Sequence, residues 1–206
     1  MESRDYRLSR ILSFILHPLL IPTLTISALM LQPGLNSIIL PDALNLWFLT
    51  MIFVFTLAIP AGSVFLLFRF NAVNSLELNL RNERTIPLLI ASSSYMALLY
   101  LMRPTNMPPV FMYVLYAATF ALLAGLLINL VYKISLHTLG WGAVTAALTG
   151  ISIHLGIPLL PYIFVSILLS GLAGYARLNE NAHNQAQVYL GYVAGVFIII
   201  LITFLA

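Results

Sequence analysis

The chain has 206 residues, of which 61% are hydrophobic and only 7% are charged. Soluble domains carry about 25% charged residues, so this composition excludes a soluble globular domain and predicts one all-α integral membrane domain over residues 1–206. With no cysteine, disulfides and thiol catalysis are excluded; the scattered histidines and carboxylates lack a metal-ligand spacing, so we expect no metal and no cofactor.

Apolar runs long enough to cross a bilayer recur along the whole chain and predict a polytopic bundle of six or seven spans. The first span contains His17-Pro18 and Pro22, which predict a kink, and no cleavage site follows the basic amino terminus, so we expect this span to be retained. The predicted spans are, in chain order, residues 8–31, 44–70, 87–103, 110–132, a fifth that follows 133–138 and ends near 155, then 157–176 and 188–206.

Three polar segments, residues 71–87, 133–138 and 177–187, fall on one face of the membrane when the crossings are counted, together with the amino terminus. Eight of the nine basic residues fall there, and only Arg103 is on the opposite face. The positive-inside rule predicts that this face is cytoplasmic. The net charge of +3 therefore reports orientation, and with no basic face interleaved with aromatics we expect no nucleic-acid partner.

The segment 177–187 is the most unusual of the three, because it places Arg, His, Glu and Gln between two membrane-length apolar runs. His183 and Gln187 are four residues apart and share a helical face. Arg177 lies six residues before His183, so a turn must bring its guanidinium round, and the asparagines at 179, 181 and 184 favour that turn. Gly191 and Gly195 lie on one stripe of the last span and predict a close approach of a neighbouring helix.

Cationic and imidazole side chains contributed by separate segments at one face predict an oxyanion site. Phosphate fits such a site, because arginine binds it through two hydrogen bonds and helix amino termini add aligned N–H donors. Of two histidines beside a phosphate, one can attack phosphorus and the other can protonate the leaving oxygen. We therefore expect His137, His183 and Arg177 to line one cavity.

These residues resemble the motifs of the type 2 phosphatidic acid phosphatase family, the membrane lipid phosphatases related to vanadium haloperoxidases. Ala176-Arg177, five residues, His183, three residues and Gln187 keep the spacing of that family's third motif, with Ala for Ser and Gln for Asp. Ile134-Ser135-Leu136-His137 is similar to the second motif, Pro-Ser-Gly-His. The first motif is only faintly similar to residues 81–87, and the region that carries the resemblance is about 77–195.

The resemblance implies a phosphatase-like core that acts on a lipid or polyprenyl phosphate in a bacterial inner membrane without a metal. His183 would form a phosphohistidine, and His137 would be the general acid. The phosphate oxygens would be held by Arg177, Ser135 and, from the first motif, Arg84 or Arg81.

Gln187 stands where the family has the Asp that orients and charges the nucleophilic histidine. A neutral amide orients an imidazole but does not offset the positive charge that develops on it. In the serine-protease template the equivalent Asp-to-Asn change lowers turnover by about 10⁴-fold, so we expect a loss of about 10³–10⁴-fold here, or about 4–5 kcal/mol of barrier. This departure keeps a second hypothesis open: a catalytically inactive member of the same fold that binds, scaffolds or flips a phosphorylated lipid.

Two more distant alternatives have less support. Residues 71–87 loosely resemble a segment of membrane prenyltransferases, but that chemistry needs clustered aspartates for Mg²⁺ and the segment contains none. A small transporter would be expected to show an inverted repeat, and none is visible. Among the remaining polar residues, we expect structural roles for His17 and His154, and a membrane-surface anchor at Lys133.

Overall fold

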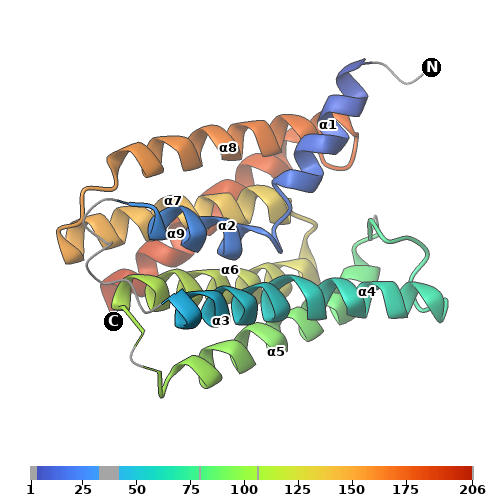
Figure 1. Cartoon of the computed structure of the whole chain (residues 1–206). Coiled ribbons are helices and arrows are strands. Elements are labelled where there is room, and N and C mark those ends of the chain that lie inside the picture. Colours follow the sequence, from blue (N-terminus) through green and yellow to red (C-terminus); the bar gives the residue numbers. More distant parts are fainter. Residues whose placement is uncertain (1–3, 33–41, 79, 106, 206) are drawn as a thin grey trace.

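The computed structural model describes residues 4–32, 42–78, 80–105 and 107–205, and every element in these residues is helical (Figure 1). Six of the helical stretches are long and apolar enough to cross a membrane, which indicates an integral membrane protein. The elements are α1 (Arg4–Ile15), α2 (Ile21–Met30), α3 (Asp42–Phe53), the π-helical turn η2 (Val54–Ala58), α4 (Ile59–Arg69), the 3₁₀ turn η3 (Asn82–Arg84), α5 (Thr85–Met102), α6 (Pro109–Val131), α7 (Leu136–Leu155), α8 (Leu160–Asn179) and α9 (Gln185–Leu205).

The predicted first span, residues 8–31, is two short helices instead of one kinked helix. The break lies at His17-Pro18, where the proline cannot continue the ladder of helical hydrogen bonds, and the His17 Nδ1 accepts a hydrogen bond from the Leu19 N–H at 3.3 Å. With 12 and 10 residues, α1 and α2 are about 18 and 15 Å long, so neither crosses a bilayer alone. Together they run from one end of the bundle to the other (Figure 1).

The predicted second span, residues 44–70, is formed by α3, η2 and α4 without interruption, and the widened turn has a clear cause. Pro60 has no N–H, so the carbonyl of Thr56 loses its helical partner, and the Ile59 N–H bonds to the Val54 carbonyl one residue further back. Two side chains of α5 donate to the carbonyls that have lost their helical partners: Ser94 Oγ donates to Phe55 O at 2.6 Å and Tyr95 Oη donates to Thr56 O at 3.4 Å. The bulge thereby joins this span to α5.

Helix α7 is the central helix of the bundle, and α9 packs against it more closely than ordinary side chains would allow. A Cβ at Gly191 would lie 2.7 Å from the Ser135 carbonyl oxygen, and one at Gly195 would clash with the Leu139 carbonyl oxygen. The predicted glycine stripe thus lies at the α7–α9 interface. This contact places the first turns of both helices, and the polar segments that precede them, side by side.

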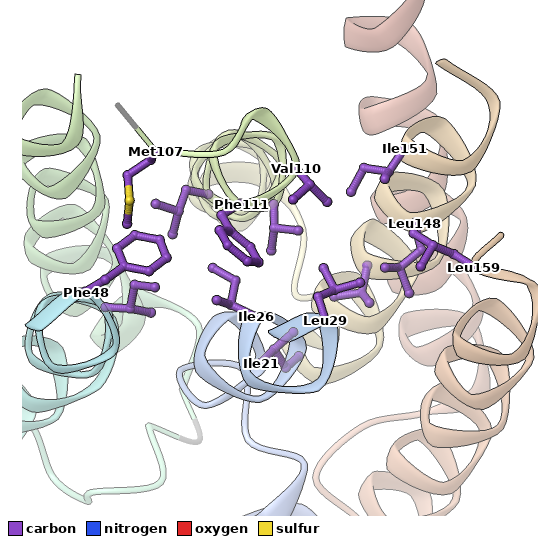
Figure 2. Packing of buried hydrophobic residues seen from close by; sticks show 14 of the residues in the cluster. Ile21, Ile26, Leu29, Phe48, Met107, Val110, Phe111, Leu148, Ile151 and Leu159 are labelled. Atoms are coloured by element: carbon purple, nitrogen blue, oxygen red, sulfur yellow. The ribbon is translucent and has the colours of Figure 1, made fainter. Parts of the chain in front are cut away.

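The short helix α2 fills the space between α3, α6 and α7. Figure 2 shows Ile26 and Leu29 of α2 among Phe48 of α3, Phe111 of α6 and Leu148 of α7, and all five are buried. At the end of α2 the Gln32 side chain donates to the Pro158 carbonyl in the α7–α8 connection, at 3.4 Å. The amino-terminal segment is therefore packed into the bundle, and α1 is held at the opposite end.

Candidate functional site

The three predicted polar segments and helix α1 meet at one end of the bundle. The connections α4–α5, α6–α7 and α8–α9 lie there, on the right of Figure 1. Hydrogen bonds join them in sequence. Arg84 Nη1 donates to the Ile134 carbonyl at 3.4 Å, and the Ser135 N–H donates to the Gln187 carbonyl at 3.1 Å. Thr138 Oγ1 adds a bond to the Val188 carbonyl at 2.8 Å.

The turn between α8 and α9 explains how six residues bring Arg177 and His183 to the same place. Helix α8 ends in a Schellman motif: the Asn181 N–H bonds to the Leu178 carbonyl at 3.0 Å and the Ala182 N–H bonds to the Arg177 carbonyl at 3.1 Å. Asn181 occupies the left-handed position of the motif with φ 53°, a conformation that asparagine tolerates better than most residues. The chain therefore reverses immediately after Arg177, and His183 returns beside the last turn of α8.

Helix α9 then begins with a capping box. The Gln187 N–H donates to Asn184 Oδ1 at 2.9 Å, and Gln187 Oε1 accepts from the Asn184 N–H at 3.3 Å. The same Oε1 lies 2.9 Å from His183 Nδ1. Because a backbone N–H can only donate, the atom that it faces is the amide oxygen, and His183 Nδ1 is therefore the protonated ring nitrogen. Nε2 of His183 retains its lone pair.

The imidazole of His183 is held in its neutral form. Burial lowers the pKa of His183 to about 3, and the positive charges of Arg84, Arg177 and Lys133 act in the same direction, while the hydrogen bond to Gln187 opposes the shift. A neutral imidazole with a free Nε2 is the form that attacks phosphorus or accepts a hydrogen bond.

Arg177 lies beside this imidazole at the end of α8. Its Nη1 donates to Glu180 Oε2 at 2.6 Å and faces Ser13 Oγ of α1 at 3.5 Å. Its Nε is buried and has no acceptor among the described residues. Arg177 lines the cavity, and its unpartnered Nε leaves the guanidinium with hydrogen-bonding capacity for an oxyanion.

Arg84 is the second cation of the site, and its environment differs from that of Arg81. The Arg84 side chain is buried, and its Nε donates to the Leu78 carbonyl at 2.7 Å. Arg81 instead donates to the Leu130 carbonyl at the end of α6, at 2.7 Å, and does not line the cavity that contains Arg84, Arg177 and His183. Of the two arginines predicted from the faint first motif, Arg84 thus lies in the site. Arg81 instead joins the α4–α5 connection to the end of α6.

Ser135, which the resemblance assigns to a phosphate oxygen, is the amino-terminal cap of α7. Its Oγ accepts from the Thr138 N–H at 3.4 Å, the side chain is fully buried, and it does not line the cavity. His137 follows in the first turn and does line the cavity. Its Nε2 lies 3.1 Å from the Ser13 carbonyl oxygen, which can only accept, so this nitrogen carries a proton.

Helix α1 supplies a fourth segment that the sequence did not identify as part of the site. Besides Ser13, it contributes Ser9, whose Oγ accepts from Asn179 Nδ2 of α8 at 2.8 Å. The helix break places the His17 ring edge-on to the His137 ring, with centroids 5.3 Å apart, and both rings line the cavity. The histidine and proline inside the apolar run predict this break in the helix. They do not predict that the side chains of α1 lie in the site.

One cavity of about 780 Å³ connects these groups with the interior of the bundle. Its polar end is lined by Arg84, Arg177, His17, His137 and His183. Its other end extends between α2, α4, α5, α6 and α7, where it is lined by apolar side chains, among them Ile21, Val64, Ala91, Val114 and Ala147. The exposed aromatic rings of Phe14 and Phe65 also line it, so the cavity reaches the apolar outer surface between α1 and α4. Its shape and chemistry suit a molecule with an anionic head and an apolar tail.

Within the residues that the structure describes, no three His, Asp or Glu side chains gather closely enough to hold a metal ion. In comparisons with known proteins, no protein-family model, curated protein or solved structure matches the chain.

Proposed function

We propose that this protein is a membrane-embedded, metal-independent phosphatase-like protein that binds the phosphate of a lipid or polyprenyl phosphate at the polar end of the cavity. The observation that carries the proposal is the placement of a neutral His183, with its Nε2 lone pair, beside the buried guanidinium of Arg84 and the partly buried one of Arg177, in a cavity that continues into an apolar interior. The motif likeness to type 2 phosphatidic acid phosphatases supports the same interpretation and would make this bundle a variant of their core.

In the proposed reaction, Arg84 and Arg177 hold the phosphate oxygens, and Nε2 of His183 attacks phosphorus. A bond from nitrogen to phosphorus forms as the bond to the lipid oxygen breaks, and His137, after it has taken up a second proton, gives a proton to that oxygen. Water then attacks the phosphohistidine and returns a proton to His137, so that a lipid alcohol and orthophosphate are released. Gln187 keeps Nδ1 of His183 protonated throughout.

The proposal is tested with purified protein in detergent, using phosphatidic acid and undecaprenyl diphosphate as substrates. We expect orthophosphate release by the parent chain and none by His183→Ala. His154→Ala is the matched control, because His154 lies at the far end of α7 and does not line the cavity. Release by the parent chain that does not exceed that of His183→Ala would reject the enzyme.

A second function, binding or flipping a phosphorylated lipid without hydrolysis, is favoured by two specific observations. Gln187 is neutral, and the Nε2 proton of His137 is engaged by the Ser13 carbonyl instead of facing the cavity freely. This function predicts phosphate-dependent lipid binding with no turnover. Turnover that appears in Gln187→Asp would identify the chain as a phosphatase that has lost its charged partner.

We also propose that the site faces the cytoplasm, because the described cations outside the site, Arg4, Arg7, Arg10, Arg69, Arg81 and Lys133, lie at its end and Arg103 lies at the other. The chain has no cysteine, so single cysteines can report sidedness directly. We expect a cysteine at Asn74 to react only with a membrane-permeant reagent in intact cells. Labelling of that position by an impermeant reagent would show that the site faces the outside of the cell.

A further inference from the structure

The apolar arm of the cavity is lined by small side chains from three helices. Ala91 of α5, Ala118 and Ala121 of α6, and Ala143 and Ala147 of α7 all line it. On α6 and on α7 these alanines are three or four residues apart, so they share one helical face. Because protein interiors are otherwise close-packed, small side chains at these positions leave the space that the cavity occupies.

The arm ends where larger side chains take the place of the alanines. Ile151 lies one helical turn beyond Ala147 on α7, and Val114 and Phe111 lie one and two turns before the first of the α6 alanines. Ile151 and Phe111 are buried and do not line the cavity; they belong to the cluster in Figure 2, which fills the far half of the bundle. Val114 and Ala147 do line the cavity, and we call them the floor of the arm.

Tyr113 closes the bundle immediately beyond this floor. A Cβ at Gly150 of α7 would clash with Tyr113 Oη of α6, and the same Oη hydrogen-bonds to Thr203 Oγ1 of α9. Helices α6, α7 and α9 are therefore in contact at this level, and the arm has no continuation between them.

The depth of the arm follows from the helical rise. On α7 the lining residues run from His137, at the polar end, to Ala147, which is a distance of about 15 Å. On α5 they run from Arg84 to Tyr95, about 16 Å. An extended chain advances about 1.2 Å per bond, so a chain of about twelve carbons reaches the floor. This depth is half of the hydrocarbon core of a bilayer, which is about 30 Å thick.

We propose that the arm is a closed pocket for one apolar chain, and that the ligand is a single-chain lipid phosphate whose chain end lies against Val114 and Ala147. A cavity of about 780 Å³ is the size that encloses one small amphiphile. A polyprenyl chain is much longer than the arm, so most of it would have to leave through the opening beside Phe14 and Phe65. The proposal rests on the proposed phosphate site and names the class of lipid that occupies it.

The first test locates the end of the chain and needs no change at the floor. Dodecyl phosphate with a diazirine at its last carbon is photolysed with the full chain in detergent micelles, and the labelled residues are mapped by mass spectrometry. The protein carries His183→Ala, which prevents turnover. We expect label on the segments of α6 and α7 that contain Val114 and Ala147, and we expect an excess of unmodified dodecyl phosphate to remove it.

The second test makes the arm shorter. Ala147→Leu in the same His183→Ala background should weaken binding of dodecyl phosphate at least about tenfold, as for overpacking of a filled site. Octyl phosphate ends before the floor, so its dissociation constant should change less than about threefold. Ala97→Leu is the matched control, because Ala97 is an exposed residue of α5 that does not line the cavity. Each probe is compared between variants in the same micelles, so that its partition into detergent cancels.

Label confined to Phe14, Phe65 or the outer faces of the helices would show that the chain lies in the bilayer, and would overturn the pocket while leaving the phosphate site intact. Binding of phosphatidic acid without binding of dodecyl phosphate would overturn the single-chain ligand in the same way. If neither binds, the phosphate site itself is wrong. An Ala147→Leu variant that folds and weakens octyl and dodecyl phosphate equally, or neither of them, would contradict the assignment of the floor. Where that variant fails to fold, the photolabelling decides.

Discussion

Replacing Gln187 with glutamate isolates the contribution of charge to the proposed nucleophile. The two side chains have the same shape, so the introduced carboxylate keeps both acceptor contacts of the native oxygen, to His183 Nδ1 at 2.9 Å and to the Asn184 N–H at 3.3 Å. Glutamate is also the usual residue at this position of a capping box. The substitution therefore adds a negative charge beside the imidazole without removing either of these acceptor contacts.

The size of the effect follows from the distance between the charges. As His183 attacks phosphorus its ring becomes positive, about 4 Å from the new carboxylate, and two unit charges at that separation interact by about 4 kcal/mol near a protein surface. Each 1.36 kcal/mol of barrier is a factor of ten in rate, so about 10³-fold is the upper limit. Gln187 is partly exposed, and solvent screening lowers the expected gain to about 10²-fold. The same charge raises the pKa of His183 from its value of about 3.

The assay is orthophosphate release from phosphatidic acid in detergent, with the ring of His183 titrated by NMR in the same variants. The control is the double variant that combines Gln187→Glu with His183→Ala, because the added charge then has no imidazole to act on. Gln187→Asp should give a smaller gain, since its shorter side chain cannot keep both contacts. If Gln187→Glu folds with unchanged stability, raises the pKa of His183 and leaves turnover at the level of the control, the reasoning about the nucleophile is refuted.

Three further substitutions test the packing, the electrostatics and the choice of arginine. Gly195→Ala should lower the free energy of unfolding by about 1–3 kcal/mol, because the added methyl group forces α9 away from α7; Gly171→Ala, which meets nothing within 4 Å, should be neutral or stabilising by up to about 1 kcal/mol. His183 binds its proton only below pH about 3 when folded but near 6.5 when exposed, so the unfolded state gains a proton as the pH falls and stability decreases. The parent chain should lose about 2 kcal/mol between pH 7 and pH 5 relative to His183→Asn, measured by denaturant unfolding. Arg84→Gln should weaken binding of a lipid phosphate at least about tenfold, whereas Arg81→Gln should change it less than about threefold.

Each of these has an outcome that contradicts it. Equal melting temperatures for the two glycine variants would mean that α7 and α9 are not in close contact. Parallel pH profiles for the parent and the histidine variant would show that His183 is already protonated near pH 6. A loss of affinity in Arg81→Gln as large as in Arg84→Gln would restore Arg81 to the phosphate site, provided that both variants melt like the parent.

Local pattern was informative where a residue's role depends on its near neighbours in the chain. The glycine stripe of the last span is an example, because spacing along one helix decides that Gly191 and Gly195 share a face. The turn after Arg177 is another, since the asparagines at 181 and 184 take part in a Schellman motif and a capping box whose hydrogen bonds join only residues close together in the chain. Gln187 was expected to orient His183, and the two lie in hydrogen-bond contact because they are one helical turn apart.

Local pattern was less informative where a partner comes from a distant part of the chain. Nothing in the sequence distinguishes Arg81 from Arg84 as a phosphate ligand. The position of the α6–α7 connection decides that Arg84 is the one that lines the cavity. The serine of the predicted second motif could be a phosphate ligand or a helix cap, and its hydrogen bond to Thr138 makes it a cap. The sequence predicts a structural role for His17. In the structure, α1 packs against α7 and α8, and the His17 ring that follows it lies beside His137 in the cavity.

The amino-acid sequence by itself determines that this is a helical membrane protein with its polar segments at one end, because the free energy of moving side chains out of water depends on composition over about twenty residues. It also determines the turn that joins Arg177 to His183. The tertiary structure alone decides that α1 covers the site and that Arg84 lines the cavity. Those contacts depend on how whole helices pack, and helix packing is set by complementary surfaces far apart in the chain.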